Sequence, residues 1–127
     1  MTWTTTSAGA VWQPPTDVYE TADGYVVRVE IAGVDPEQVS VAVADRALTV
    51  CGVRRDPEPK TGYHRMEILY GPFQTRAILP RRVEAAHITA AYHDGFLTVT
   101  VPKASPVRVR VDGGMQEGEG QEPTPPK

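Results

Sequence analysis

Two segments of alternating apolar residues flank an Asp-Gly pair in the stretch Ile88 to Lys103. Asp-Gly is a preferred dipeptide for a two-residue hairpin turn in which both residues have positive φ. Folding the chain at Asp94-Gly95 places Tyr92 opposite Leu97, and side chains alternate between the two faces of a strand. One face of the hairpin is then almost wholly apolar and carries Ile88, Ala90, Tyr92, Leu97, Val99 and Val101. The sequence therefore predicts a β-hairpin that buries this face.

Further short segments show the same period of two. Tyr25 to Ile31 alternates after an Asp-Gly turn signal, and Asp17 to Glu20 precedes that turn as its partner strand. Phe73 to Leu79 predicts another strand, which ends at a proline. Many short strands, several turns and no helical period of useful length predict an all-β fold, with two antiparallel sheets packed as a β-sandwich.

A second hairpin is predicted around Asp45-Arg46. Val39, Val41 and Val43 alternate with small residues before it. A tight turn there sets Val43 opposite Leu48 and Val41 opposite Val50, so the apolar residues again meet on one face.

Residues 54–72 form the least regular interior part, with three prolines, two glycines and mixed charge. Only Tyr63 to Leu69 has the composition of a short strand there. Long irregular loops inside compact domains are usually functional or belong to an interface. The alternative interpretation is a merely solvated surface loop.

Composition excludes several classes of protein. The 127 residues suit one domain, and 40% apolar with 23% charged residues is typical of a globular protein. No apolar run approaches the roughly 18 residues of a membrane span, and the N-terminus lacks a signal pattern, so we expect a cytoplasmic protein. Cys51 is the single cysteine, which rules out an internal disulfide and a multi-cysteine metal site.

The net charge of −3 is unevenly distributed. Residues 1–111 hold 12 basic and 12 acidic groups, whereas residues 112–127 hold four acidic groups and one basic group. A neutral body without a basic stripe argues against nucleic acid as a partner. The acidic, Gly- and Pro-rich tail 112–127 is predicted to be disordered.

No pattern of catalytic or ligand residues is present. His64, His87 and His93 lie far apart and lack ligand spacing with a carboxylate or cysteine. A reactive Cys51 would require basic or histidine neighbours. The chain has no phosphate loop, no G-x-S-x-G and no dinucleotide fingerprint. The sequence therefore predicts no enzyme activity, no cofactor and no metal.

The hairpin residues also carry a resemblance to a known family. Ala90, Asp94-Gly95 and Leu97 match an A-x-x-x-n-G-x-L signature, with Asp where Asn is commoner, and Val101-Pro102-Lys103 match the V-P-K that follows it. The chain thus resembles the small heat-shock proteins, whose alpha-crystallin domain is an immunoglobulin-like β-sandwich. Other blocks agree in order from about residue 12 to 103: Trp12-Gln13-Pro14 with Asp17 to Thr21, Gly33 to Val39, Leu48 to Gly52 with Arg54, Gly71 to Phe73, and Leu79-Pro80.

Two departures from the family pattern are visible. Ala32 replaces the usual Pro, and Thr75 stands where many members carry an arginine of an inter-subunit ion pair. Arg76 follows, but successive side chains on a strand point to opposite faces. We therefore do not expect Arg76 to replace that pair.

The resemblance implies four parts of the chain. Residues 1–13 form a short flexible arm, 14–103 the alpha-crystallin domain, 104–111 a C-terminal anchor and 112–127 the tail. Val107, Val109 and Val111 resemble the family's I-x-I/V anchor, although an edge strand guarded by arginines is an alternative. The expected receptor is a groove between the strand of Val39, Val41 and Val43 and the strand of Ile88, Ala90 and Tyr92.

The resemblance also implies self-association and a function. In bacterial and plant members a strand crosses to the neighbouring subunit, and here it corresponds to Tyr63, His64, Arg65, Met66, Glu67, Ile68 and Leu69. With a short arm, we expect dimers or small oligomers. The favoured function is an ATP-independent holdase whose partners are unfolding client proteins. The alternatives are a CS-domain-like adaptor for a folded chaperone and, less favoured, an enzyme on a β-sandwich.

Overall fold

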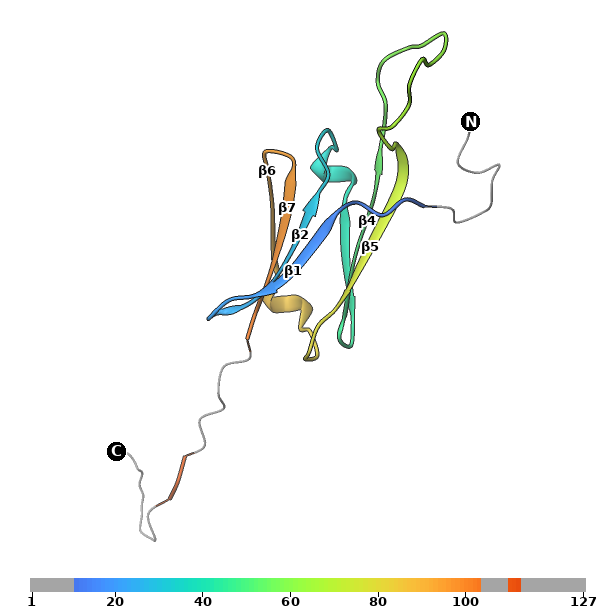
Figure 1. Ribbon diagram of the computed structural model, residues 1–127. Coiled ribbons are helices and arrows are strands. Elements are labelled where there is room, and N and C mark those ends of the chain that lie inside the picture. The colour runs from blue at the N-terminus through green and yellow to red at the C-terminus, as the bar shows by residue number, and fades with distance from the viewer. Residues whose placement is uncertain (1–10, 104–109, 113–127) are drawn as a thin grey trace.

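The computed structural model describes residues 11–103 and 110–112 of the chain. These residues form two antiparallel sheets packed face to face (Figure 1). The strands are β1 Thr16–Glu20, β2 Gly24–Glu30, β3 Ser40–Ala44, β4 Ala47–Arg54, β5 Gly71–Ile78, β6 Thr89–His93 and β7 Phe96–Pro102. Two single-turn 3-10 helices, η1 Pro36–Gln38 and η2 Ala85–His87, lie in connections.

The strand order places particular edges at the outside of the sandwich. One sheet has the order β1-β2-β7-β6 and the other has the order β3-β4-β5. β6 and β3 are therefore edge strands, one in each sheet. β1 and β5 are the opposite edges. The all-β antiparallel sandwich expected from the sequence is confirmed.

The hairpin predicted at Asp94-Gly95 joins β6 to β7. Both turn residues have positive φ, 51° and 85°, as a two-residue turn of this type requires. Tyr92 pairs with Leu97 as predicted. The ladder ends at Thr89 opposite Thr100, so Ile88 lies just outside it.

The second hairpin, between β3 and β4, also has the predicted register. Val43 pairs with Leu48, and Val41 pairs with Val50. Asp45 takes a φ of 55°, which an aspartate tolerates better than a branched residue. The turn thereby directs the apolar side chains of both strands to the same face.

The core lies between the two sheets and is built from alternate residues of their inner faces. β2 contributes Val27 and Val29, β4 contributes Leu48 and Val50, and β7 contributes Val99, all nearly inaccessible to solvent. The alternation in the sequence therefore corresponds to the alternation between the buried inner face and the outer face of each sheet.

The prediction that the whole hairpin face is buried is wrong at β6. Leu97, Val99 and Val101 are buried, but Tyr92 and Ile88 are only half-buried and Ala90 is exposed. Because β6 is an edge strand, its inner face is only partly covered.

Trp12, placed in the flexible arm by the sequence, belongs to the packed domain. Its side chain is 7% exposed and its ring lies 5.6 Å from that of Phe73. Its backbone forms a parallel bridge with β5, donating to the carbonyl of Pro72 and accepting from the amide of Gln74. The segment before Pro14 therefore covers part of the β5 edge.

Two further predicted strands have different outcomes. Tyr63 to Leu69 is not a strand in the single chain, because no other segment of that chain pairs with it among the described residues. Val107 and Val109 lie outside the described residues. Val111 is described, has no strand conformation and is 78% exposed.

Replacing Leu97 by Ala tests the assignment of the inner face. The Leu97 side chain is buried on β7, so truncation should lower the free energy of unfolding by about 2–5 kcal/mol. Urea denaturation measures the change. Thr100→Ala, on the exposed face of the same strand, is the matched control. A change for Leu97→Ala within about 0.5 kcal/mol, as surface substitutions give, would contradict the assignment.

Candidate functional site

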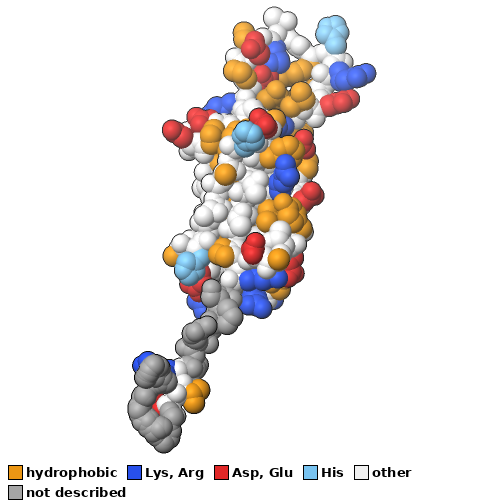
Figure 2. Space-filling model, turned by 90° about the vertical axis from the view of Figure 1, so that its left-hand side faces the viewer, with side chains coloured by type: hydrophobic (Ala, Val, Ile, Leu, Met, Phe, Trp, Pro, Cys, Tyr) orange, Lys and Arg blue, Asp and Glu red, His pale blue; other side chains and the backbone are white. Residues whose placement is uncertain are grey.

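Four large exposed apolar side chains lie close together in sequence on the loop of residues 55–70, which connects β4 to β5. Tyr63 is 49% exposed, Met66 55%, Ile68 60% and Leu69 48%. The loop extends beyond the end of the sandwich in Figure 1, and Figure 2 shows hydrophobic side chains mixed with charged ones over it. Clustered exposed apolar groups of this kind are typical of an interaction surface.

The base of this loop is held by Arg54 at the end of β4. The guanidinium donates through Nε and Nη2 to the carbonyl of Leu69, at 2.9 and 2.7 Å. It also donates through Nη1 to the carbonyl of Ala32 at 3.2 Å. The end of β4, where the loop begins, is therefore joined to Leu69 near the end of the loop through one side chain.

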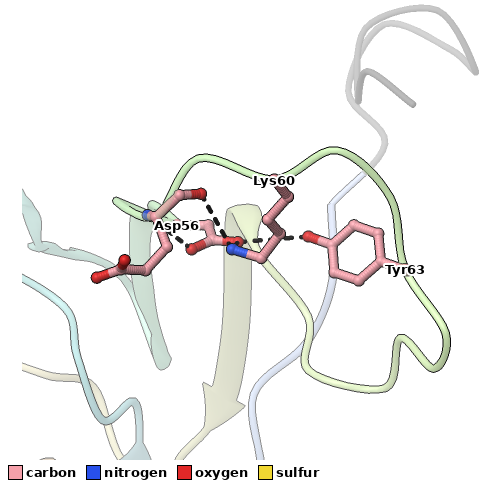
Figure 3. A network of polar contacts seen from close by, with 4 residues as sticks. Asp56, Lys60 and Tyr63 are labelled. Atoms are coloured by element: carbon pink, nitrogen blue, oxygen red, sulfur yellow. Dashed lines mark hydrogen bonds and ion pairs between the residues drawn. The ribbon is translucent and has the colours of Figure 1, made fainter.

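A second polar network orders the first half of the loop (Figure 3). Asp56 pairs with Lys60 and accepts hydrogen bonds from the Glu58 amide at 3.1 Å and from the Tyr63 hydroxyl at 3.3 Å. The hydrogen bond from Lys60 is the main reason that the pKa of Asp56 is lowered from its ordinary value. The same contact raises the pKa of Lys60.

β1 presents an open strand edge on the described part of the chain. It pairs with β2 alone, so its other side has N–H and C=O groups without a ladder. Val18 and Tyr19 on this strand are exposed. Such an edge can accept an additional strand.

The other candidate surface is the flank formed by the edge strands β3 and β6. Five apolar residues are only partly buried there and pack against the core: Val39, Val41, Val43, Ile88 and Tyr92. Ala90 on the same strand is exposed. Tyr92 is fixed by donating its hydroxyl to the carbonyl of Ile31 at 3.0 Å. Of the residues expected to line a groove, Val41 and Val43 lie on β3 and Ala90 and Tyr92 on β6, whereas Val39 and Ile88 directly precede these strands.

Thr75 replaces the family arginine with a contact inside the chain. It is 3% exposed, and its Oγ1 lies 2.8 Å from the Oγ1 of Thr16 on β1. Arg76 is exposed on the other face of β5. The hydrogen bond satisfies a buried hydroxyl and links the two sheets.

Groups able to support catalysis or metal binding are sparse. In residues 11–103 and 110–112, no three or more His, Cys, Asp or Glu side chains gather in a metal-binding arrangement. His64, His87 and His93 are exposed. The Cys51 thiol points to the outer face of β4 and donates to Gln74 Oε1 at 3.7 Å. Across these same residues, no helix has the length and apolar character needed to span a membrane.

Comparison of the sequence with models of known protein families gives a match over most of the domain. The model of the Hsp20/alpha crystallin family matches residues 17–112. The chain therefore belongs to this family, as its resemblance predicted.

Individual proteins that are similar in sequence to this chain are also heat shock proteins. The chain is 41% identical over 91 residues to the 16.9 kDa class I heat shock protein 1 of Triticum aestivum, covering 69% of this chain and 60% of that protein. It is 31% identical over 99 residues to small heat shock protein C2 of Rickettsia felis, covering 76% and 64%. The chain thus spans less than two thirds of the length of these relatives.

Solved structures give the same fold. A small heat-shock protein from Xylella fastidiosa superposes with a TM-score of 0.70 at 28% identity, covering 87% of this chain and 100% of that one. The hspA protein of Xanthomonas axonopodis gives a TM-score of 0.67 at 32% identity, covering 74% and 96%.

The Asp56 network has a testable pH dependence. A lowered pKa means that its contribution to loop order is present above the ordinary aspartate pKa of about 3.9 and is lost as pH falls through the lowered value. The Glu58 amide proton, bonded to this carboxylate, should therefore titrate with a midpoint below about 3.9 in an NMR pH series. Asp56→Asn should abolish the titration. A midpoint at or above the ordinary value would contradict the network.

Proposed function

We propose that the protein is an ATP-independent holdase that binds partly unfolded proteins and prevents their aggregation. The observation that carries this proposal is the exposed apolar loop surface beside open strand edges, in a chain of the Hsp20/alpha crystallin family. No bond is made or broken in such a function, so it requires no catalytic residues and no cofactor.

The driving force follows from the exposed groups of both partners. An unfolding client exposes apolar surface, and covering such surface is worth roughly 25 cal/mol per Å². Edge strands add backbone hydrogen bonds that do not depend on the client's sequence. Together these terms favour broad selectivity for unfolded chains over recognition of one folded partner.

The favoured assembly is a dimer formed by strand exchange. The segment Tyr63 to Leu69 would leave its own domain and pair with the open edge of β1 in a second copy. Two observations support this pairing. The segment has no strand partner within its own described chain, and β1 has a free edge with exposed Val18 and Tyr19.

The flank of β3 and β6 is the proposed receptor for the C-terminal anchor. Val107, Val109 and Val111 would place their shared apolar face between Val41 and Val43 on one side and Ile88 and Tyr92 on the other. The six residues from Lys103 to Val109 reach at most about 20 Å when extended. Docking on the same chain or a close neighbour therefore fits, and the expected assembly is a dimer or small oligomer.

A CS-domain-like adaptor is the less favoured function. The family model that matches is that of Hsp20 and alpha crystallin, and the long loop between β4 and β5 is suited to an exchanged strand.

Suppression of aggregation tests the holdase proposal directly. A heat-labile test protein should scatter less light when warmed with this protein, without nucleotide, and more so at higher temperature as assemblies loosen. Equal masses of an inert globular protein provide the control. Suppression that requires ATP, or no suppression at any ratio, would contradict the proposal.

Ile68→Glu tests strand exchange. Its side chain is 60% exposed in the single chain, so the charge should cost the monomer little but should weaken a dimer that covers it. Ile78→Glu, at a side chain 56% exposed near the end of β5, is the matched control. Sedimentation equilibrium should show a monomer for Ile68→Glu and a dimer for Ile78→Glu. A dimer of unchanged affinity for Ile68→Glu would rule out the exchange.

Changing Val109 and Val111 together to Ala tests the anchor. The domain should stay folded, while any mass above the dimer falls because the apolar face of the segment is lost. Arg108→Gln, on the other face, should leave the mass unchanged. Light scattering coupled to gel filtration measures both, and a large assembly that persists in the double variant would exclude this anchor.

A further inference from the structure

Arg54 makes more contacts to distant segments than its position at the end of β4 requires. Besides its bonds to Leu69 and Ala32, its guanidinium lies 4.5 Å from the ring centroid of Trp12 and 5.6 Å from that of Tyr70. One side chain at the end of β4 therefore contacts three other segments. These are the N-terminal segment at Trp12, the connection between β2 and β3 at Ala32, and the end of the 55–70 loop at Leu69 and Tyr70.

The backbone explains why these segments meet. Arg54 pairs with Gly71 at the last position of the ladder between β4 and β5. Gly71 has a φ of 97°, which a glycine adopts without a Cβ penalty, and so the chain turns sharply as the loop enters β5. The turn brings the carbonyl of Leu69 within reach of the guanidinium.

The N-terminal segment completes the same cluster. Trp12 donates from Nε1 to the carbonyl of Gly71 at 3.2 Å, and its ring stacks against the guanidinium of Arg54. A planar guanidinium suits this place because it can donate in its plane while its faces contact aromatic rings. A lysine would retain the charge but could not make both kinds of contact.

We propose that Arg54 is a positioning residue that closes the base of the 55–70 loop and fixes where Tyr63 to Leu69 leaves the domain to pair with a second copy. The proposal rests on the proposed strand-exchange dimer. Arg54 does not itself touch the partner chain in this account; it acts through the loop.

Preorganisation gives the physical reason. A loop whose two ends are held together samples fewer conformations than an open one, so less entropy is lost when its middle becomes ordered on a partner. Releasing Leu69 from Arg54 would increase that loss. The dimer should then weaken, while the sandwich core, which does not include Arg54, remains intact.

Arg55 is a natural control for charge and location. It is the next residue, is exposed, and has no hydrogen bond, ion pair or ring contact in the part of the chain that the structure describes. Both arginines line the same cavity of about 730 Å³ beside the loop base. A difference between the two variants therefore reports the contacts of Arg54 and not the loss of a positive charge.

The experiment compares Arg54→Met, Arg54→Lys and Arg55→Met in the full chain with Trp3→Phe, so that Trp12 is the single tryptophan and can be excited selectively. Sedimentation equilibrium measures the dimer dissociation constant. Acrylamide quenching of Trp12 fluorescence measures how accessible the indole ring is to solvent, and so reports whether its packing against residue 54 persists. Both Arg54 variants should raise the dissociation constant by about tenfold and increase quenching, whereas Arg55→Met should change neither. Urea denaturation in the Ile68→Glu background, which is expected to be monomeric, measures the stability of the domain alone. There the Arg54 variants should have a free energy of unfolding close to that of their parent.

The outcomes separate this proposal from the dimer on which it rests. If the parent protein is monomeric at all accessible concentrations, the exchange dimer is refuted, and with it the role of Arg54 in pairing. If the parent dimerises, an Arg54→Met dissociation constant within about twofold of the parent would overturn the positioning role. An equal weakening by Arg55→Met, or full dimer affinity in Arg54→Lys, would also overturn it, because charge alone would then be sufficient.

Discussion

Burial of one apolar layer between the two sheets is the interaction on which the rest of the structure depends. Val27, Val29, Leu48, Val50 and Val99 form its centre, and each comes from an interior strand of its sheet. The layer fixes the register of every hairpin, since a shift of one residue would place the apolar set in water. It does not extend fully to β6 and β3, whose inner side chains remain half-buried. The same constraint that stabilises the domain therefore leaves apolar edges open.

The loop between β4 and β5 shows how local order can exist without a core. Its residues 55–69 are largely exposed, yet Asp56 organises the first half and Arg54 closes the base. These contacts limit the conformations of the loop without burying its apolar side chains. A segment arranged in this way is suited to a partner surface, and the open edge of β1 offers backbone groups for it.

The sequence predicts most of the fold because the information is local. Asp94-Gly95 and the alternation around it specify a turn and its register, and the ladder from Tyr92–Leu97 onward follows. Burial of Ala90 was overestimated because alternation identifies the inner face of a strand but not whether that strand lies at an edge. The family motif does contain Trp12, yet only tertiary packing on Phe73 places it in the domain.

The candidate site was less predictable because its contacts join segments far apart in the chain. Arg54 matches a family motif, but nothing local indicates that its guanidinium meets Leu69 and Ala32. Thr75 was recognised as a departure from the family, whereas its hydrogen bond to Thr16 depends on how the two sheets pack. The composition of Tyr63 to Leu69 likewise does not indicate which strand could pair with it.

Hydrogen exchange at different protein concentrations tests the central claim most directly, namely that the open loop and strand edges are completed by a second copy. The amides of Tyr63 to Leu69 should exchange rapidly in dilute protein and become protected as the concentration passes the dimer dissociation constant. Amides of β2 and β7 should stay protected throughout. If the protein is dimeric by mass while the amides of Tyr63 to Leu69 remain unprotected, the chains associate through another surface and the account is contradicted.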